Sequence, residues 1–242
     1  MTHNDDVIAP PAQPRIPVRG GGMFPVHRVY CVGRNFADHA REMGADAPAS
    51  KAARGTPVFF LKPADALVLD GSIAYPPGTR ELHHEVELVV ALGRDAGGGM
   101  LDPSDAEALV FGYAIGLDLT HRDLQSAPKV KGLPWDTGKS FDQSAPVSEL
   151  LRANAVGALA PRVLSLAVNG AVRQQSALDQ LIWDVPEILH ELSRFYALRA
   201  GDLVFMGTPA GVGPLVPGDT FHAALDDLLE LRGTIVAPVA SC

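Results

Sequence analysis

The 242-residue sequence has little of what marks several protein classes. It contains two cysteines, Cys31 and Cys242, so we expect neither a disulfide framework nor a thiolate metal site. No apolar run approaches the roughly 18 residues that a membrane-spanning helix needs. Lysine and arginine form no dense run, and the formal net charge of −8 argues against a nucleic-acid partner. The first residues contain no apolar core of the kind found in signal peptides, so a cytoplasmic protein without a membrane partner is favoured.

The composition is that of a globular protein with a substantial core. Hydrophobic residues make up 47% of the chain and charged residues 20%. Residues 1–25 contain five prolines and a glycine triplet, which predicts an irregular N-terminal arm. No boundary signal follows, and we therefore predict a single domain over residues 26–242.

Residues 83–93 are typical of a strand that enters the core. Polar and apolar residues mostly alternate up to Leu88, and the residues that follow are apolar. Since side chains two positions apart share one face of a strand, Glu85 and Glu87 are predicted to point the same way. Two close carboxylates repel each other unless a cation neutralises them, which indicates a metal site. A solvated strand face with two charges also fits this pattern.

A second apolar segment, residues 110–117, ends at Asp118. Asp118 lies 31 positions beyond Glu87, which leaves room for a connection that returns the chain and pairs the two strands. Asp118 is then either a third oxygen ligand for a metal ion or a cap on the following turn.

A short helix is predicted after the Gly33–Arg34 break, with Asn35 as its N-cap. His39 and Glu42 are three positions apart, so their side chains are neighbours on one helix face. Such a pair is either a surface ion pair or a catalytic pair. Phe36, Ala40 and Met43 form the adjoining apolar stripe.

Two loops carry polar residues that fit a binding site. Lys139 follows a glycine- and proline-rich segment that also contains Trp135, and loops that combine cations with aromatic residues often line sites. A solvated lysine is the alternative. Residues 207–213 predict a tight turn that presents backbone N–H groups and the Thr208 hydroxyl to a ligand carboxylate.

Local signals in the last third predict a hairpin and a capped helix. Asn169–Gly170 is the signal of a type I′ turn between two strands. Asp184 and Glu187 form a capping box for a helix. The predicted core stripe of this helix consists of Ile188, Leu189, Leu192 and Phe195.

Seven segments of the chain together resemble the fumarylacetoacetate hydrolase family, in the order in which that family has them. They cover about residues 26–222 and are most similar to the short acylpyruvase and fumarylpyruvate hydrolase branch. The matching segments are Val32–His39, Phe60–Pro63, His83–Glu87, Gly116–Asp123, Lys131–Trp135, Gly138–Asp142 and Gly207–Gly213.

The resemblance implies an α+β fold that is mainly β, a mixed β roll or sandwich with peripheral helices, in a homodimer. It implies Mg²⁺ or Mn²⁺, a small anionic oxo acid as substrate, and His83 and His84 as supporting residues. The implied metal ligands are Glu85, Glu87 and Asp118. The implied catalytic residues are His39, Glu42 and Lys139. The implied substrate-binding residues are Arg34, Arg122, Gln125 and Thr208.

The implied reaction is hydrolysis of the C3–C4 bond of an acylpyruvate, with fumarylpyruvate giving fumarate and pyruvate in aromatic-compound catabolism. His39, oriented by Glu42, would take a proton from the water that attacks the C4 carbonyl, and Lys139 would stabilise the oxyanion. The pyruvate enolate that leaves would be stabilised by the metal ion.

Other functions stay open at this point. Oxaloacetate decarboxylation uses the same metal and enolate without an attacking water, and isomerase–decarboxylases of hydroxylated oxo-diacids are a third enzyme class. A catalytically silent metal-binding protein is the alternative outside enzymes. The chain has no Gly-x-Ser-x-Gly elbow, which argues against a serine hydrolase. A fumaryl tail would need a further cation, for which Arg34, Arg41 and Lys131 are candidates.

Overall fold

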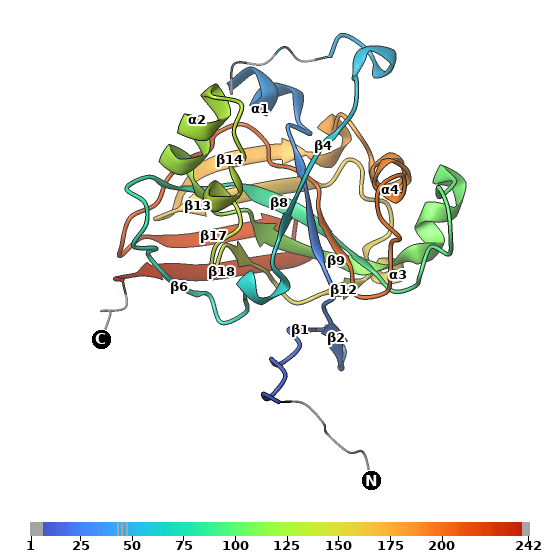
Figure 1. Ribbon diagram of the computed structural model, residues 1–242, viewed down its shortest axis with the longest axis horizontal. Helices are drawn as coiled ribbons and strands as arrows, with labels where there is room; N and C mark the ends of the chain where they lie inside the picture. Colours follow the sequence, from blue (N-terminus) through green and yellow to red (C-terminus); the bar gives the residue numbers. More distant parts are fainter. Residues whose placement is uncertain (1–6, 43, 45, 47, 239–242) are drawn as a thin grey trace.

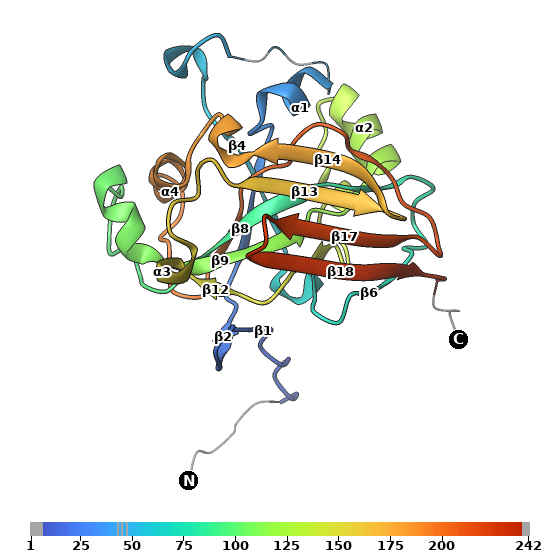
Figure 2. The ribbon, with the colours of Figure 1, turned by 180° about the vertical axis from the view of Figure 1, so that it is seen from behind.

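The computed structural model describes residues 7–42, 44, 46 and 48–238, and over these residues two large sheets dominate (Figures 1 and 2). The first has six strands in the order β12–β9–β8–β15–β3–β4, and the second has five in the order β14–β13–β17–β18–β6. The first sheet consists of β12 (Leu151–Arg152), β9 (Val110–Leu117), β8 (Val86–Leu92), β15 (Leu203–Phe205), β3 (Val29–Gly33) and β4 (Val58–Lys62). The second consists of β14 (Ala171–Ala177), β13 (Val163–Val168), β17 (Thr220–Leu225), β18 (Leu229–Val236) and β6 (Ser72–Ala74).

Smaller sheets and short helices surround these two layers. The small sheets are β10–β7–β16 (Thr120–His121, Leu82–His84, Gly213–Pro214), β1–β2 (Arg15–Pro17, Met23–Pro25) and β11–β5 (Ala145–Pro146, Leu67–Val68). The α-helices are α1 (Ala37–Glu42), α2 (Arg122–Val130), α3 (Ala153–Val156) and α4 (Val185–Ser193). Parallel and antiparallel pairs both occur, which confirms the predicted mainly-β α+β class with mixed sheets. In the described part of the chain, no helix is long and apolar enough to cross a membrane.

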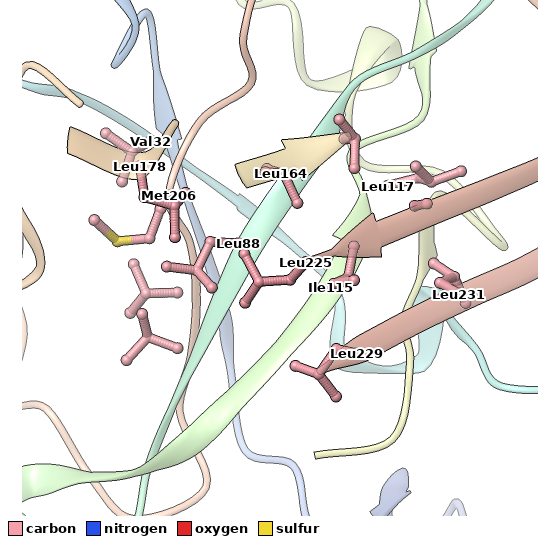
Figure 3. Close-up of a cluster of buried hydrophobic side chains, with 14 of the residues drawn as sticks. Val32, Leu88, Ile115, Leu117, Leu164, Leu178, Met206, Leu225, Leu229 and Leu231 are labelled. Carbon is pink, nitrogen blue, oxygen red and sulfur yellow. The ribbon is translucent and has the colours of Figure 1, made fainter. Parts of the chain in front are cut away.

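The main core lies between the two large sheets. Leu88 of β8 and Ile115 of β9 meet Leu164 of β13 and Leu225 of β17 (Figure 3). Each of these four side chains is almost fully buried. Burial of such apolar side chains stabilises each by about 1.5–3 kcal/mol, so the contacts hold the two sheets together.

The opposite face of the six-stranded sheet is also buried. Val89 and Ala91 of β8 belong to a second core, which contains Ile16 of β1 and Phe24 of β2. Because β8 is covered on both faces, its residues are apolar without alternation. The hairpin β1–β2 lies at the end of the molecule opposite α1 and α2 (Figure 1). The predicted irregular arm is therefore wrong for residues 15–25.

Several local predictions can now be compared with the structure. The Asn169–Gly170 turn joins β13 to β14, with positive φ at both residues, and the capping box of Asp184 and Glu187 is present; both predictions are confirmed. Phe195 lies beyond the end of α4 and is 69% exposed, so its assignment to the core was wrong. The single-domain prediction for residues 26–242 stays a prediction.

The helix start at Asn35 also differs from the prediction. Asn35 is buried and does not cap α1. Its side chain instead accepts from the backbone of Trp183 and donates to the carbonyls of Trp183 and Met206. A buried amide must satisfy both its donors and its acceptor, and three distant backbone groups do this here. Met43, placed on the helix stripe, lies outside the described residues.

Candidate active site

The predicted pairing of two apolar strands brings three carboxylates together. β8 and β9 are antiparallel, and Glu87 lies opposite Gly116. The strand is interrupted at Glu85, because β7 joins another sheet while β8 begins at Val86. The backbone N–H of Asp118 donates to the carbonyl of Glu85 over 2.8 Å, which sets Asp118 beside the glutamate pair.

Glu85, Glu87 and Asp118 form a buried acidic cluster. Their exposed fractions are 4%, 1% and 1%, and one carboxylate oxygen of each lies within 4.8 Å of the others. Three like charges at this spacing repel each other strongly away from water. The cluster therefore requires positive charge close by.

Two lysines and an arginine supply part of that charge. Lys139 Nζ lies 2.7 Å from Glu85 Oε2 and also contacts Asp118 Oδ2. Arg122 pairs with the other oxygen of Glu85, and Lys62 Nζ is 2.9 Å from Asp118 Oδ1.

The charges act unequally on the two glutamates. Burial opposes ionisation of Glu85, but Lys139, Arg122 and His39 outweigh it and hold the pKa of Glu85 well below its usual range. Burial, together with the carboxylates of Asp118 and Glu85, raises the pKa of Glu87 well above its usual range. Among the described residues, Glu87 forms no ion pair, and its Oε2 accepts one hydrogen bond, from the N–H of Gly207.

This donor set fits Mg²⁺ or Mn²⁺. All three side chains offer carboxylate oxygens, the ligands that hard divalent ions prefer. Glu87 is a buried carboxylate without a cationic partner in the described chain, and a divalent ion bound by the cluster would supply one. Glu85, Glu87 and Asp118 are the residues that would hold it.

The hydrogen bond from Gly207 to Glu87 depends on the backbone conformation of Gly207. Its φ is +92°, and an added Cβ would lie 2.7 Å from Asn35 Cβ, so no other residue fits without a shift. In this conformation its N–H points at Glu87. The N–H of Gly211 donates to Glu42. The prediction that backbone N–H groups of this turn face a ligand is thus wrong for these two residues, which bind protein carboxylates.

His39 and Glu42 form the predicted pair on α1. His39 Nδ1 is 3.1 Å from Glu42 Oε2, and His39 is 5% exposed. A carboxylate can only accept, so Nδ1 carries the hydrogen and Nε2 keeps its lone pair when the ring is neutral. Because Glu42 also accepts from Gly211, the pair ties α1 to the loop after β15.

A cavity of about 160 Å³ joins these groups. Of the residues predicted for the site, it is lined by Arg34, His39, Glu85, Glu87, Asp118, Arg122, Gln125, Lys139 and Thr208. Glu42 lies behind His39 and does not line it. The geometry thus brings the predicted residues together, while their roles stay predictions.

Gln174 is a buried residue that the sequence analysis did not predict. Its Oε1 accepts from the N–H of Val86 and from Nδ1 of His84, and its Nε2 donates to Thr208 Oγ1 and to the carbonyl of Pro209. Burial lowers the pKa of His84, which favours the neutral ring that donates from Nδ1 to Gln174. Gln174 lies in a hairpin of the other sheet, and no spacing in the sequence connects it to Thr208.

The cations that lie near the site are not all those that the sequence analysis proposed for the fumaryl tail. Lys62 is 2% exposed and contacts Asp118 and the backbone carbonyl of Lys139. Lys129 and Lys131 are both exposed, but of the two only Lys129 lines the cavity. Arg41 pairs with Asp38 at the surface. A sequence signal for Lys129 does exist, because it follows Arg122 and Gln125 at i+7 and i+4 on one helix face.

Comparisons with known proteins agree with the site. The family model described as "Fumarylacetoacetate (FAA) hydrolase C-terminal" matches residues 28–236. The chain is 39% identical to a mitochondrial oxaloacetate tautomerase of Bos taurus, over 87% of this chain and 92% of the relative. It is 41% identical to a fumarylpyruvate hydrolase of Ralstonia sp, over 73% of this chain and 91% of the relative.

The fold of this chain is also similar to that of a solved structure. It is the fumarylpyruvate hydrolase from Pseudomonas aeruginosa in complex with Mn²⁺ and pyruvate. Its TM-score is 0.89 at 46% identity, and the match covers 96% of this chain and all of the other. The fold therefore has a counterpart in a protein whose structure contains Mn²⁺, an ion that the carboxylate donors of the acidic cluster fit.

Proposed function

Since the chain belongs to the fumarylacetoacetate hydrolase family, we propose that it is a metal-dependent hydrolase that cleaves the C3–C4 bond of an acylpyruvate, with fumarylpyruvate as its substrate. The observation that carries this proposal is the position of His39. It lines the same cavity as the acidic cluster, and its Nδ1 is held by Glu42. The structure of the Pseudomonas aeruginosa relative contains Mn²⁺ and pyruvate, and pyruvate is one product of this reaction.

In the proposed reaction, one side chain of the cavity transfers the proton and another stabilises the negative charge. His39 Nε2 takes a proton from the water that adds to the C4 carbonyl. Lys139, whose pKa is raised because Asp118 and Glu85 outweigh the opposing effect of burial, stays protonated and donates to the C4 oxyanion. A bound divalent ion supplies Lewis-acid stabilisation of the negative charge on the oxo-acid end.

Collapse of the C4 oxyanion breaks the C3–C4 bond, and the electron pair passes to C3 as pyruvate enolate. His39 returns its proton to C3, which gives pyruvate and the free carboxylic acid. The Arg122 guanidinium and the Thr208 hydroxyl would hold the carboxylate of the oxo-acid end, since both line the cavity beside Glu85 and Glu87.

Oxaloacetate turnover is the second candidate function. It is favoured by the 39% identity to the Bos taurus oxaloacetate tautomerase over most of the chain. Decarboxylation or tautomerisation would use the same acidic cluster but needs no attacking water. A cytoplasmic homodimer that acts in aromatic-compound catabolism stays a prediction.

A substrate panel separates the two candidates. Fumarylpyruvate, acetylpyruvate and oxaloacetate are assayed with Mg²⁺ and with Mn²⁺, for the wild type and for His39→Ala. We expect the wild type to cleave both acylpyruvates. In His39→Ala, the rate of this cleavage should fall by at least 100-fold, and the rate of oxaloacetate turnover should fall less. Failure of the wild type to cleave either acylpyruvate with either metal would rule the hydrolase out, and turnover of oxaloacetate alone would favour the second candidate.

A further inference from the structure

Two cations line the active-site cavity without a carboxylate partner. Arg34 comes from the turn between β3 and α1, and Lys129 from the last turn of α2. Within residues 7–42, 44, 46 and 48–238, neither forms an ion pair with an acidic side chain, whereas Lys139 and Arg122 in the same cavity do.

The surroundings of Lys129 are strongly positive. Arg34 and Lys129 are both exposed residues. Partial desolvation and the charges of Arg34, Lys139 and Arg122 lower the pKa of Lys129, and Glu85 opposes them. Lys139, Arg122 and Lys62 pair with Glu85 and Asp118, so these two carboxylates already have cationic partners other than Arg34 and Lys129. The positive charges of Arg34 and Lys129 are thus not paired with acidic side chains of the described chain. An anion bound between them would reduce their mutual repulsion.

An apolar wall lies in the same cavity. It is formed by Val58, Phe60 and Trp135, with the two aromatic rings 5.3 Å apart and packed edge to face. Lys129 Nζ lies 5.8 Å from the centroid of the Trp135 ring. A short, flat hydrocarbon chain would pack on such a wall, and a negative group at its far end would meet the ammonium.

We propose that Arg34 and Lys129 bind a carboxylate at the far end of the acyl group, so that the substrates are acylpyruvates with a short, flat acyl chain that ends in a carboxylate. This inference rests on the proposed hydrolase function and deepens it. It assigns the second carboxylate of the substrate to Arg34 and to Lys129, in place of Arg41 or Lys131. It also gives the apolar wall a role, which is to hold the carbons between the C4 carbonyl and the terminal carboxylate.

The test compares fumarylpyruvate with acetylpyruvate, which lacks the tail carboxylate. For Mn²⁺-loaded protein, the ratio of kcat/KM for fumarylpyruvate to that for acetylpyruvate should fall at least ten-fold in Lys129→Met and in Arg34→Gln. The loss on fumarylpyruvate should appear mainly as a higher KM. Lys129→Arg should restore most of the ratio. The matched control is Lys131→Met, two positions away and outside the cavity, for which the ratio should not change.

An unchanged ratio in Lys129→Met and Arg34→Gln would overturn the inference, even if both substrates were cleaved more slowly. Failure of the proposed function looks different, because the wild type would then cleave neither compound. Binding still tests the tail site in that case. Calorimetric titration of Mn²⁺-loaded protein should show weaker binding of fumarylpyruvate, relative to pyruvate, in Lys129→Met than in the wild type. The proposal would be overturned if Lys129→Met weakened the binding of fumarylpyruvate and of pyruvate equally, or if it weakened the binding of neither.

Discussion

The side-chain amide of Gln174 donates to Thr208 Oγ1 over 2.8 Å, and this bond decides where the threonine hydrogen points. The amide orientation is unambiguous, because Oε1 of Gln174 accepts from the backbone N–H of Val86. Thr208 Oγ1 therefore acts as the acceptor toward Gln174. Its own hydrogen is left to donate elsewhere, and Thr208 lines the cavity. Gln174 thus prepares Thr208 to bind a ligand oxygen.

Gln174→Glu should weaken substrate binding by reversing that hydrogen bond. A carboxylate at this position still accepts from Val86, but Thr208 would then donate to it and no longer to the ligand. We expect KM for an acylpyruvate to rise about ten-fold with a smaller change in kcat, the size of one hydrogen bond to a charged group. Steady-state kinetics measures both constants.

A double-variant cycle gives the control for this prediction. Thr208→Val should raise KM similarly, and Gln174→Glu with Thr208→Val should be no worse than either alone, because both remove the same donor. Gln175→Glu, on the exposed neighbouring residue, should behave as wild type. Additive losses in the double variant would show that Gln174 acts independently of Thr208.

Glu87→Gln should stabilise the metal-free protein and abolish its response to metal. Glu87 is 1% exposed and has no cationic partner in the described chain, so its charge is unfavourable until a divalent ion binds. We expect the metal-free variant to melt a few degrees above the metal-free wild type. Added Mn²⁺ should raise the melting temperature of the wild type but not of the variant. Calorimetry in chelator and in Mn²⁺ measures both, and an equal rise in the two proteins would place the metal elsewhere.

Lys139→Met should greatly lower kcat while the fold survives. The ammonium bridges Glu85 and Asp118, and in the proposed reaction it also donates to the oxyanion. Loss of one such donor lowers kcat by about 100- to 1,000-fold. The measurement is kcat on acetylpyruvate, with far-ultraviolet circular dichroism as a check on folding. Turnover within a few-fold of wild type would assign Lys139 to charge neutralisation alone.

Glu187→Gln should change how stability depends on pH in acid. Partial burial opposes ionisation of Glu187, but hydrogen bonds from Arg54, from the N–H of Asp184 and from Lys51 lower its pKa to about 2. A lowered pKa stabilises the fold above the unfolded-state value of about 4.3, and this contribution is lost as the pH falls toward 2. Urea unfolding should show wild type more stable than Glu187→Gln at pH 7, and the difference should shrink at pH 3. A difference that is the same at both pH values would contradict an ionised Glu187.

Some parts of the site could be predicted from local sequence. Alternation up to Leu88 predicted Glu85 and Glu87 on one face, and the end of the second apolar segment predicted Asp118 as a third ligand. The three carboxylates do lie together, although the strand is interrupted at Glu85. The three-residue spacing of His39 and Glu42 was likewise enough to make them neighbours. The resemblance to the family supplied the roles, and the family is confirmed.

Local sequence was enough to predict the pair of apolar strands that carries the acidic cluster and the capped helix α4, since each depends on periodicity or on residues within a few positions. The mainly-β class came from the resemblance to the family. Which charged groups come into contact depends instead on the packing of the whole chain. Gln174 reaches Thr208 from the other sheet, and Lys62 reaches Asp118 across 56 positions. Such contacts depend on how the sheets pack and on which groups lose water, and no local pattern encodes either. The hairpin of residues 15–25 formed for the same reason, because only the packed sheet offers its apolar side chains a partner.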